Sequence, residues 1–368
     1  MTQSKLHTKY VLTIEVLTPL HVGNGHELLR DYDYVVHGGR TWVIDQERLL
    51  EATLGEGGEL DNTLLARPPA ELLQPNDFHK DSPFFRYVMP GEPANRPLRE
   101  QIKDVWGKPY LPGSTVKGAL RTLLMWGIYT AEKHQPAFAK LGNKRERAAQ
   151  ELERGIFGPD PNHDWLRALH VADSSPVSAE ALRVERTSVF PTGRGSVGQV
   201  KRSGGVIVDV EALSGKTAFV HEVAIEEYGF GNPRAAQELK WDADWRRRFD
   251  WIPRIGQYYA AQRVKDEQRF YKQKPSQASN FFTWLEKQPV AENEWFMQLG
   301  WGTSWHSKTL NNLLTEQPNF EKEVVGRYKL ARGRRQPGDP FPKSRNLVQR
   351  NGQPALPMGW VKCRLEAI

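Results

Sequence analysis

Tyr110-Leu111-Pro112-Gly113-Ser114-Thr115-Val116-Lys117-Gly118-Ala119-Leu120-Arg121 is the strongest helix-opening signal in the chain. Pro112-Gly113 interrupts the preceding segment, and Ser114 stands where a hydroxyl can cap the first free amide groups. Apolar residues then recur at helical spacing, at Val116, Leu120, Leu123, Leu124 and Ile128. The pattern predicts an amphipathic helix from Ser114 to about Ala131.

The first turns of this helix combine two cations with free backbone amides. Lys117 and Arg121 are four residues apart and share one face, and the first turn contains no acid. A helix N-terminus with its positive dipole end suits a phosphate group. We therefore expect an anion site for a phosphodiester backbone here, formed by Gly113, Ser114, Thr115, Lys117 and Arg121. A plainly capped helix with a solvated Lys/Arg face is the alternative.

Composition indicates a globular protein with a sizeable core. The chain has 368 residues, of which 39% are hydrophobic, and it carries 51 Lys and Arg against 44 Asp and Glu. Such an excess indicates a polyanionic partner only if it is clustered. A single cysteine, Cys363, excludes an internal disulfide framework, and no segment reads as a signal peptide or a membrane span. We expect a cytoplasmic protein that does not enter a membrane.

The first 55 residues predict a strand, a hairpin and a helix. Residues 9 to 20 alternate as a half-buried strand, and the loop His21-Val22-Gly23-Asn24-Gly25 follows it. Two glycines and an asparagine there allow close approach of a ligand, although a plain turn explains them equally well. Gly38-Gly39 predicts a hairpin between residues 34–36 and 41–44, and Asp45 is placed to cap a short helix that ends before Gly55.

The middle of the chain is less regular. Residues 55 to 95 read as a surface insertion, and 140 to 155 as a charged helix with a solvated face. Residues 183 to 205 are rich in Arg, Lys and Gly, and we interpret them as a flexible arm that contacts nucleic acid, with a disordered loop as the alternative. The cations of its second half are Arg194, Lys201 and Arg202. A second hairpin is predicted at 206–224, and an aromatic helical segment that packs in the core at 240–273.

A second glycine-rich element follows a predicted strand at residues 295–299. It reads Gly300-Trp301-Gly302-Thr303-Ser304-Trp305-His306-Ser307-Lys308-Thr309. Two tryptophans beside glycines, hydroxyls and a lysine are the combination that binds single-stranded nucleic acid. Gly302 to Thr309 also imitates a nucleotide-binding P-loop, but Ser307 replaces the glycine that must precede the lysine. We therefore do not assign an NTPase.

The C-terminal part holds the clustered charge. Eight Lys and Arg and a single acid, Asp339, lie between Arg327 and Arg350, so this segment alone accounts for the net charge of +7. A solvated basic tail is the alternative to a polyanion-binding segment. Residues 359 to 368 predict a closing strand that returns to the sheet.

Known catalytic and metal-binding patterns are missing from the sequence. His21, His26 and His37 lack the spacing of a known metal site, and we predict neither a metal nor a cofactor. Asp31 and Asp33 are the acids nearest to the first glycine loop. They are the candidates if the protein cuts RNA.

Three motifs together resemble the RAMP superfamily of CRISPR effector subunits. They are residues 17–25, residues 107–122, and residues 299–302 with Ser307-Lys308-Thr309, and they occur in the family's order. The central motif is common to many RAMP proteins. The outer two make the chain most similar to the type III-A Csm-complex subunit that caps the 3′ end of the guide RNA.

The resemblance implies one elaborated α+β domain over residues 1–368. Its fold would be a modified ferredoxin-like (RRM-type) sheet with helical and loop insertions near 55–95, 135–165 and 235–290. It also implies guide-RNA (crRNA) binding without sequence readout. The residues implied are His21, Gly23, Asn24, Gly25, Gly113, Ser114, Thr115, Lys117 and Arg121 from the first two motifs, and Gly300, Trp301, Gly302, Trp305, Ser307 and Lys308 from the third.

The resemblance further implies a non-catalytic subunit that takes part in crRNA maturation and antiviral defence. Its partners would be the crRNA, the target RNA, a neighbouring RAMP backbone subunit and a small helical subunit, with host ribonucleases as further candidates. Backbone neighbours in such complexes cut target RNA with an acid that follows the first strand. Here Asp31 and Asp33 are expected on a strand, and a metal-dependent RAMP endoribonuclease that uses one of them remains the alternative.

Overall fold

The computed structural model describes all residues except 1–5, 54–65, 95, 192–205, 273–275 and 332–338. Its central layer is a five-stranded antiparallel sheet with the order β11-β14-β1-β10-β7. These strands are β1 (His7–Val16), β7 (Leu169–Val171), β10 (Ala218–Glu226), β11 (Glu294–Gln298) and β14 (Trp360–Ala367). The predicted return of the C-terminal strand to the sheet is confirmed, and this strand lies between β1 and β11.

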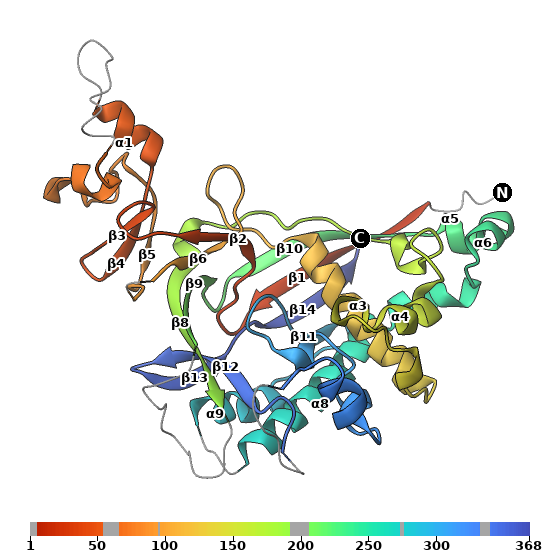
Figure 1. Ribbon diagram of the computed structural model, residues 1–368. Helices are drawn as coiled ribbons and strands as arrows, with labels where there is room; N and C mark the ends of the chain where they lie inside the picture. Colours follow the sequence, from red (N-terminus) through yellow and green to blue (C-terminus); the bar gives the residue numbers. More distant parts are fainter. Residues whose placement is uncertain (1–5, 54–65, 95, 192–205, 273–275, 332–338) are drawn as a thin grey trace.

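Two long helices cover one face of this sheet. They are α3 (Gly113–Ala131) and α8 (Ile252–Tyr271), and they pack against each other (Figure 1). Leaving aside β11, the shorter helices and the strands of the other sheets, β1, α3, β7, β10, α8 and β14 follow one another in the β-α-β-β-α-β order of a ferredoxin-like motif. Val116, Leu120 and Leu124 of α3 are fully buried in the core beneath.

A second, six-stranded sheet has the order β13-β12-β8-β9-β6-β2. It is antiparallel except for the pair β6 and β9. Its strands are β2 (Gly23–Leu28), β6 (Leu98–Gln101), β8 (Leu182–Pro191), β9 (Ile207–Leu213), β12 (Ser344–Arg350) and β13 (Gln353–Pro357). The edge strand β2 carries the first glycine loop and is exposed along most of its length.

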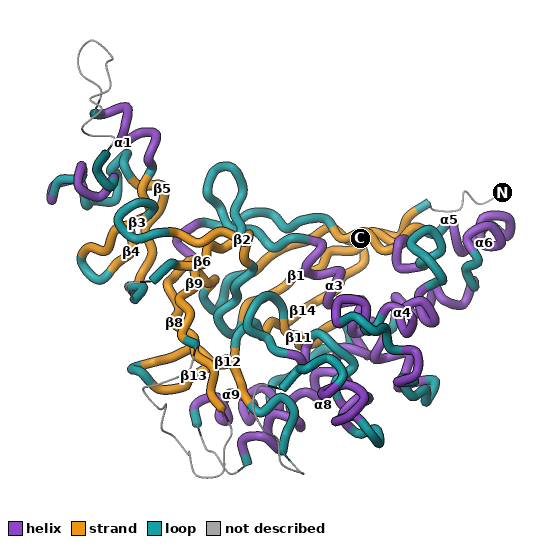
Figure 2. Tube along the Cα trace, in the orientation of Figure 1, coloured by secondary structure: helices purple, strands orange, loops and turns teal. Residues whose placement is uncertain are grey.

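A small sheet forms a lobe at one end of the molecule (Figure 2). It consists of β3 (Tyr34–His37), β4 (Arg40–Ile44) and β5 (Phe85–Pro90), and α1 (Gln46–Ala52) packs on it. The Gly38-Gly39 hairpin and the Asp45 cap are confirmed, since the Asp45 carboxylate accepts from Arg48 N. Residues 85–90 of the segment expected as a surface insertion thus form the strand β5. This strand belongs to a lobe with its own small hydrophobic core.

Shorter helices lie around the two main ones. They are α4 (Gln150–Phe157), α5 (Tyr228–Gly231), α6 (Pro233–Leu239), α7 (Arg247–Asp250), α9 (Gln277–Glu286) and α10 (Asn312–Thr315). The prediction of a helix at 140–155 is therefore wrong in its bounds, because the observed helix α4 begins only at Gln150. The segment near 235–290, expected as an insertion, contains α8, which packs on α3 and β11.

The second predicted hairpin is wrong in its pairing. The turn at Ser214 to Lys216 exists, but β9 pairs with β8 and β6, whereas β10 pairs with β1 and β7. The chain therefore passes from one sheet to the other at this turn. Sequence periodicity gives strands without their partners, so it could not reveal this step.

Candidate nucleic-acid interface

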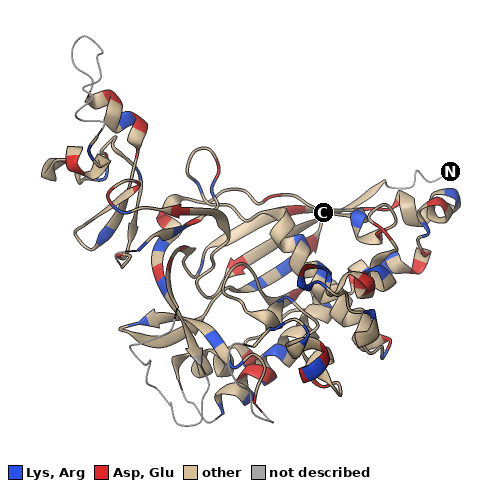
Figure 3. Ribbon diagram, in the orientation of Figure 1, with Lys and Arg blue, Asp and Glu red and all other residues tan. Residues whose placement is uncertain are grey.

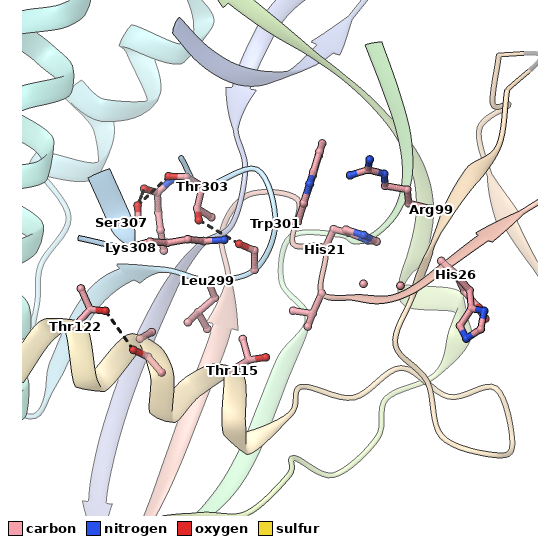
Figure 4. Close-up of a pocket in the computed structure, with 18 of the residues that line it drawn as sticks. His21, His26, Arg99, Thr115, Thr122, Leu299, Trp301, Thr303, Ser307 and Lys308 are labelled. Atoms are coloured by element: carbon pink, nitrogen blue, oxygen red, sulfur yellow. Dashed lines mark hydrogen bonds between the residues drawn. The ribbon is translucent and has the colours of Figure 1, made fainter. Parts of the chain in front are cut away.

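The three motif segments meet around one cavity of about 660 Å³ (Figure 4). The first glycine loop and β2 form one wall, the first three turns of α3 form the floor, and the loop after β11 forms the opposite wall. The lining residues are His21, Val22, Gly23, Gly25, His26, Glu27, Arg99, Glu100, Thr115, Gly118, Ala119, Thr122, Gln298, Leu299, Gly300, Trp301, Thr303, Ser307 and Lys308. Segments almost 300 residues apart in the chain are thereby brought together.

The two glycine-rich loops are joined backbone to backbone. Trp301 N donates to the carbonyl oxygen of His21 over 2.8 Å. Gly300 has φ +78°, and a Cβ there would lie 2.3 Å from the same carbonyl oxygen. Only glycine fits this approach, so the close packing of the loops explains the glycine that precedes Trp301.

His21 acts as a buried, neutral link between the sheets. Its Nδ1 donates to the carbonyl oxygen of Glu211 over 2.6 Å, which leaves Nε2 without a proton. Burial lowers the pKa of His21 to about 4, and the nearby cations Arg99 and Lys103 act in the same direction. The imidazole therefore offers an acceptor to its surroundings at neutral pH.

Trp301 lies half-buried at the rim between the two sheets. Its ring meets the edge of the His21 ring at a centroid distance of 6.1 Å, and the Arg99 guanidinium lies 5.0 Å from the ring centroid. Arg99 also pairs with Glu27 over 3.5 Å. One face of the tryptophan is thus already covered by a cation.

The start of α3 differs from the expected anion site. The helix begins at Gly113 with Pro112 as its N-cap residue, and Ser114 is exposed and makes no capping bond. Instead, Gly113 N donates to Asp173 Oδ1 over 2.7 Å. The carboxylate of Asp173 holds the positive helix end that we expected to receive a phosphate. The Ser114 cap is therefore wrong, and the Gly113 amide is taken by Asp173, whereas Thr115 and Gly118 do line the cavity.

Lys117 and Arg121, expected to hold phosphates, are engaged by groups of the fold itself. Lys117 Nζ donates to the carbonyl oxygen of Leu169 over 2.7 Å, and burial lowers its pKa. Arg121 pairs with Glu153 over 2.9 Å and with Asp164 over 2.7 Å, and it lies 4.0 Å from the centroid of the Phe157 ring. Neither side chain lines the cavity.

The loop after β11 supplies hydroxyls and one lysine. The Ser307 hydroxyl donates to Gln298 Oε1 and to the carbonyl oxygen of Thr303, and the Thr303 hydroxyl donates to the carbonyl oxygen of Gly300. Lys308 is exposed at the wall, although partial burial lowers its pKa. Within the described part of the chain, no carboxylate lies within 4.0 Å of its ammonium group.

Trp305 is not a free stacking surface. Its ring packs against Phe341 at a centroid distance of 5.0 Å and against Phe320 at 5.9 Å. The short turn Trp305–Ser307 is a 3₁₀ helix, so the P-loop-like residues do not open a long helix. Gly302, with φ +81°, packs against Asn346 and Met358, and it does not line the large cavity.

The acids considered for RNA cleavage lie in a turn, which corrects their expected place on a strand. Asp33 accepts from Leu29 N over 2.7 Å and from Gln46 Nε2 over 3.0 Å, so it stabilises the turn. Asp31 has φ +68° and pairs with Arg30 over 3.8 Å. Neither acid borders the cavity. Over the described ranges, no three His, Cys, Asp or Glu come together as a metal site.

The remaining predicted cations do not form one patch. Arg194, Lys201 and Arg202 lie outside the described residues. In the basic C-terminal segment, Arg345 pairs with Glu267, Arg350 pairs with Glu185, and Arg327 donates to the carbonyl oxygen of Leu141. Figure 3 shows Lys and Arg interspersed with Asp and Glu over the elements. Arg332, Arg334 and Arg335 of this segment also lie outside the described residues, and the three described cations named above are engaged within the fold.

Several cavity residues were missed by the sequence interpretation. Arg99 and Glu100 come from β6, and Gln298 comes from the end of β11. Asn24, which was predicted, donates instead to Glu100 Oε2 over 2.8 Å and so braces β2 against β6. No local motif marks Arg99 or Glu100, because only the pairing of β6 with β2 brings them to the cavity. In the part of the chain described, every helix is too short or too polar to cross a membrane.

Comparison with known proteins places the chain in a family. The chain is 22% identical to the CRISPR system Cms protein Csm5 of Methanocaldococcus jannaschii, over 95% of its own length and 88% of that protein. It is 27% identical to the protein of the same name from Mycobacterium tuberculosis, over 48% of this chain and 57% of that one.

Two solved structures share the fold. One is a chain of a cryo-EM structure of a Csm-crRNA-target RNA ternary complex in a type III-A CRISPR-Cas system, with a TM-score of 0.67, 24% identity and coverage of 97% of this chain and 100% of that chain. The other is the crystal structure of T. onnurineus Csm5, with a TM-score of 0.61, 23% identity and coverage of 95% and 99%. The RAMP superfamily model matches residues 13–317, which is most of the chain. The protein therefore belongs to the RAMP superfamily.

Proposed function

We propose that this protein is a non-catalytic guide-RNA-binding subunit of a type III-A Csm complex, positioned at the 3′ end of the crRNA. The observation that carries the proposal is the cavity in which the three motif segments meet. It offers hydroxyls, glycine backbone and the Lys308 cation to a ligand. The similarity to Csm5 proteins over nearly the whole chain supports the same assignment.

The chemistry of the cavity suits a single-stranded RNA backbone. Thr115 and Thr122 place hydroxyls on the floor of the cavity and Thr303 places one on a wall, and the exposed β2 edge leaves backbone groups next to them. Threonine hydroxyls and exposed glycine backbone favour contacts to phosphate and sugar, which carry no sequence information. The proposed partners are therefore the crRNA with its target RNA, and the neighbouring RAMP and small helical subunits of the same complex. Host ribonucleases that trim the guide are a further proposed partner.

Lys308 gives the sharpest test of this proposal. We expect Lys308→Ala to weaken binding of an unrelated single-stranded RNA about tenfold at low salt. It should also reduce the slope of log affinity against log salt by about one, because one phosphate contact is lost. The measurement is fluorescence anisotropy with the purified protein across a salt series.

Lys322→Ala is the matched control for this test. Lys322 is an exposed lysine that does not line the cavity. It should keep the affinity and the slope of the parent protein. An equal loss of RNA affinity in both variants would show that the RNA responds only to the overall positive charge of the protein. It would contradict the proposed interface.

A further inference from the structure

A second, small cavity lies directly behind the glycine loop. Its volume is about 20 Å³, and it is bordered by α8, by residues 302–304 of the loop and by β12. Gln298 and Thr303 line both cavities, so the loop separates the small cavity from the large one. A volume of this size holds one water molecule or one monatomic ion.

The wall of this cavity carries hydrogen-bond donors that have no acceptor. Arg263 is 3% exposed, and its Nη2 donates to Glu267 Oε1 over 3.2 Å. Its Nε and Nη1 are buried and lack a partner among the described residues, as does the hydroxyl of Tyr271, which is 6% exposed. Buried donors without a partner are costly, and native proteins satisfy nearly all of them.

The groups around the cavity also carry an excess positive charge. Glu267 is shared by two guanidinium groups, since Arg345 Nε donates to its Oε2 over 2.7 Å. Although burial acts to raise it, the pKa of Glu267 is lowered to about 2 by Arg345 and Arg263, so the carboxylate is ionised. Burial lowers the pKa of the nearby His306 to about 3, so this imidazole is neutral. The guanidinium groups of Arg263 and Arg345 thus share the single carboxylate of Glu267, which leaves one positive charge without a partner.

The adjacent acid does not remove this excess. Asp266 is the next carboxylate on α8, and its Oδ2 accepts from Asn311 Nδ2 over 2.7 Å. Its Oδ1 accepts from Gln262 and lies 3.8 Å from the Arg269 guanidinium, so it belongs to a separate ion pair at the surface. Asp266 does not line the small cavity.

We propose that this small cavity binds a monatomic monovalent anion, with chloride as the physiological occupant. The Tyr271 hydroxyl and one of the two unpartnered N–H groups of Arg263 donate to the ion, whose charge balances the second guanidinium. Phosphate and larger anions are excluded by size. Residues 302–304 of the loop after β11 form one wall of the small cavity. The bound ion therefore stabilises the conformation in which this loop lines the large cavity. A water molecule would fill the same space without neutralising the charge.

Thermal unfolding at constant ionic strength tests the proposal without RNA. Sodium gluconate is replaced stepwise by sodium chloride at pH 7.5, and Tm is recorded at each step. A ligand that binds only the folded state raises Tm, and a tenfold excess over its dissociation constant corresponds to roughly 2 °C for a chain of this size. We expect Tm to rise with the chloride concentration and then to reach a plateau.

Two tyrosines of α8 provide the variant and its control. Tyr271→Phe removes one donor to the ion and should raise the half-saturating chloride concentration at least threefold. Tyr258→Phe, at an exposed tyrosine of the same helix, should respond to chloride as the parent does. The same Tm in chloride and gluconate would show that the cavity holds water only and would overturn the proposal. A chloride response that Tyr271→Phe leaves intact would place the ion elsewhere and would overturn it as well.

Discussion

Arg121 shows how a cation in a recognised motif can serve the fold instead of a ligand. Its guanidinium is held between Glu153 and Asp164, which lie 32 and 43 residues further along the chain. It also covers the buried ring of Phe157. The motif therefore attaches α3 to the α4 region, and this use of Arg121 could not be seen in residues 110–121 alone.

We expect Arg121→Ala to lower the free energy of unfolding by about 1–3 kcal/mol. The change leaves two half-buried carboxylates without their partner and exposes the Phe157 ring. RNA affinity of the folded variant should stay within about twofold of the parent. Urea unfolding and RNA binding are the two measurements.

The matched control for Arg121→Ala is Arg234→Ala. Arg234 forms an exposed i,i+4 pair with Glu238, and pairs of this kind contribute at most about 0.5 kcal/mol. A loss of RNA affinity in Arg121→Ala without a loss of stability would restore the phosphate clamp.

Two buried histidines predict a pH dependence of stability. Burial lowers the pKa of His21 to about 4 and that of His306 to about 3, against about 6.5 in the unfolded chain. Between these values the unfolded state binds more protons, so each histidine removes roughly 1.3 kcal/mol of stability per pH unit as the pH falls from 6 to 5.

Replacing one of these histidines should therefore flatten the pH dependence. We expect His306→Gln to reduce the slope of the unfolding free energy against pH by roughly 1.3 kcal/mol per pH unit between pH 6 and pH 5. The exposed His26→Gln serves as the matched control. Parallel pH curves for His306→Gln and the parent would mean that His306 is not held neutral in the fold. The measurement is urea unfolding at closely spaced pH values.

At the level of elements, two of the three glycines of α3 have opposite roles. A Cβ on Gly113 would lie 2.1 Å from the carbonyl oxygen of Val171, so this glycine sets the contact between the helix and β7. Gly118 faces open space at the floor of the large cavity. It has no packing reason to be glycine, and helical glycine is unfavourable relative to alanine.

We therefore expect Gly118→Ala to stabilise the protein by about 0.5–1 kcal/mol and to weaken RNA binding at least threefold. The added methyl group favours the helix and narrows the floor of the cavity. Gly155→Ala in α4 is the matched control, because Gly155 also faces open space and lies away from the cavity. Gly155→Ala should stabilise the protein by a similar amount and leave its RNA affinity unchanged. Unchanged RNA affinity in Gly118→Ala would mean that the RNA does not approach this turn.

Local patterns predicted most elements but not their partners. The strands β1, β11 and β14 and the helix α3 follow from alternation, helical spacing and breakers, all of which lie within a few residues. The switch between sheets at Ser214 to Lys216, the contact of Asp173 with Gly113, and the pairing of Arg99 with Glu27 depend on tertiary contacts. The convergence of the glycine loops was implied by the family resemblance, whereas the engagement of Lys117 and Arg121 needed the three-dimensional structure.

Over the described residues of the molecule, positive and negative side chains are interspersed. Most described cations of the C-terminal segment pair with acids or carbonyl groups, so the described part of this segment forms no separate basic face. We infer that RNA is recognised by the shape and backbone of the cavity, with a small electrostatic contribution. This inference agrees with the single exposed cation, Lys308, that the third motif places at the cavity wall.

Photo-crosslinking tests this account most directly. Purified protein is bound to single-stranded RNA that carries 4-thiouridine at successive positions, irradiated, and mapped by mass spectrometry of the crosslinked peptides. We predict crosslinks in peptides that contain residues 21–27, 115–122 and 298–308, from the same RNA position or adjacent ones. Crosslinks confined to residues 327–350 or to other surfaces would contradict the claim that the three motif segments form the RNA-binding cavity.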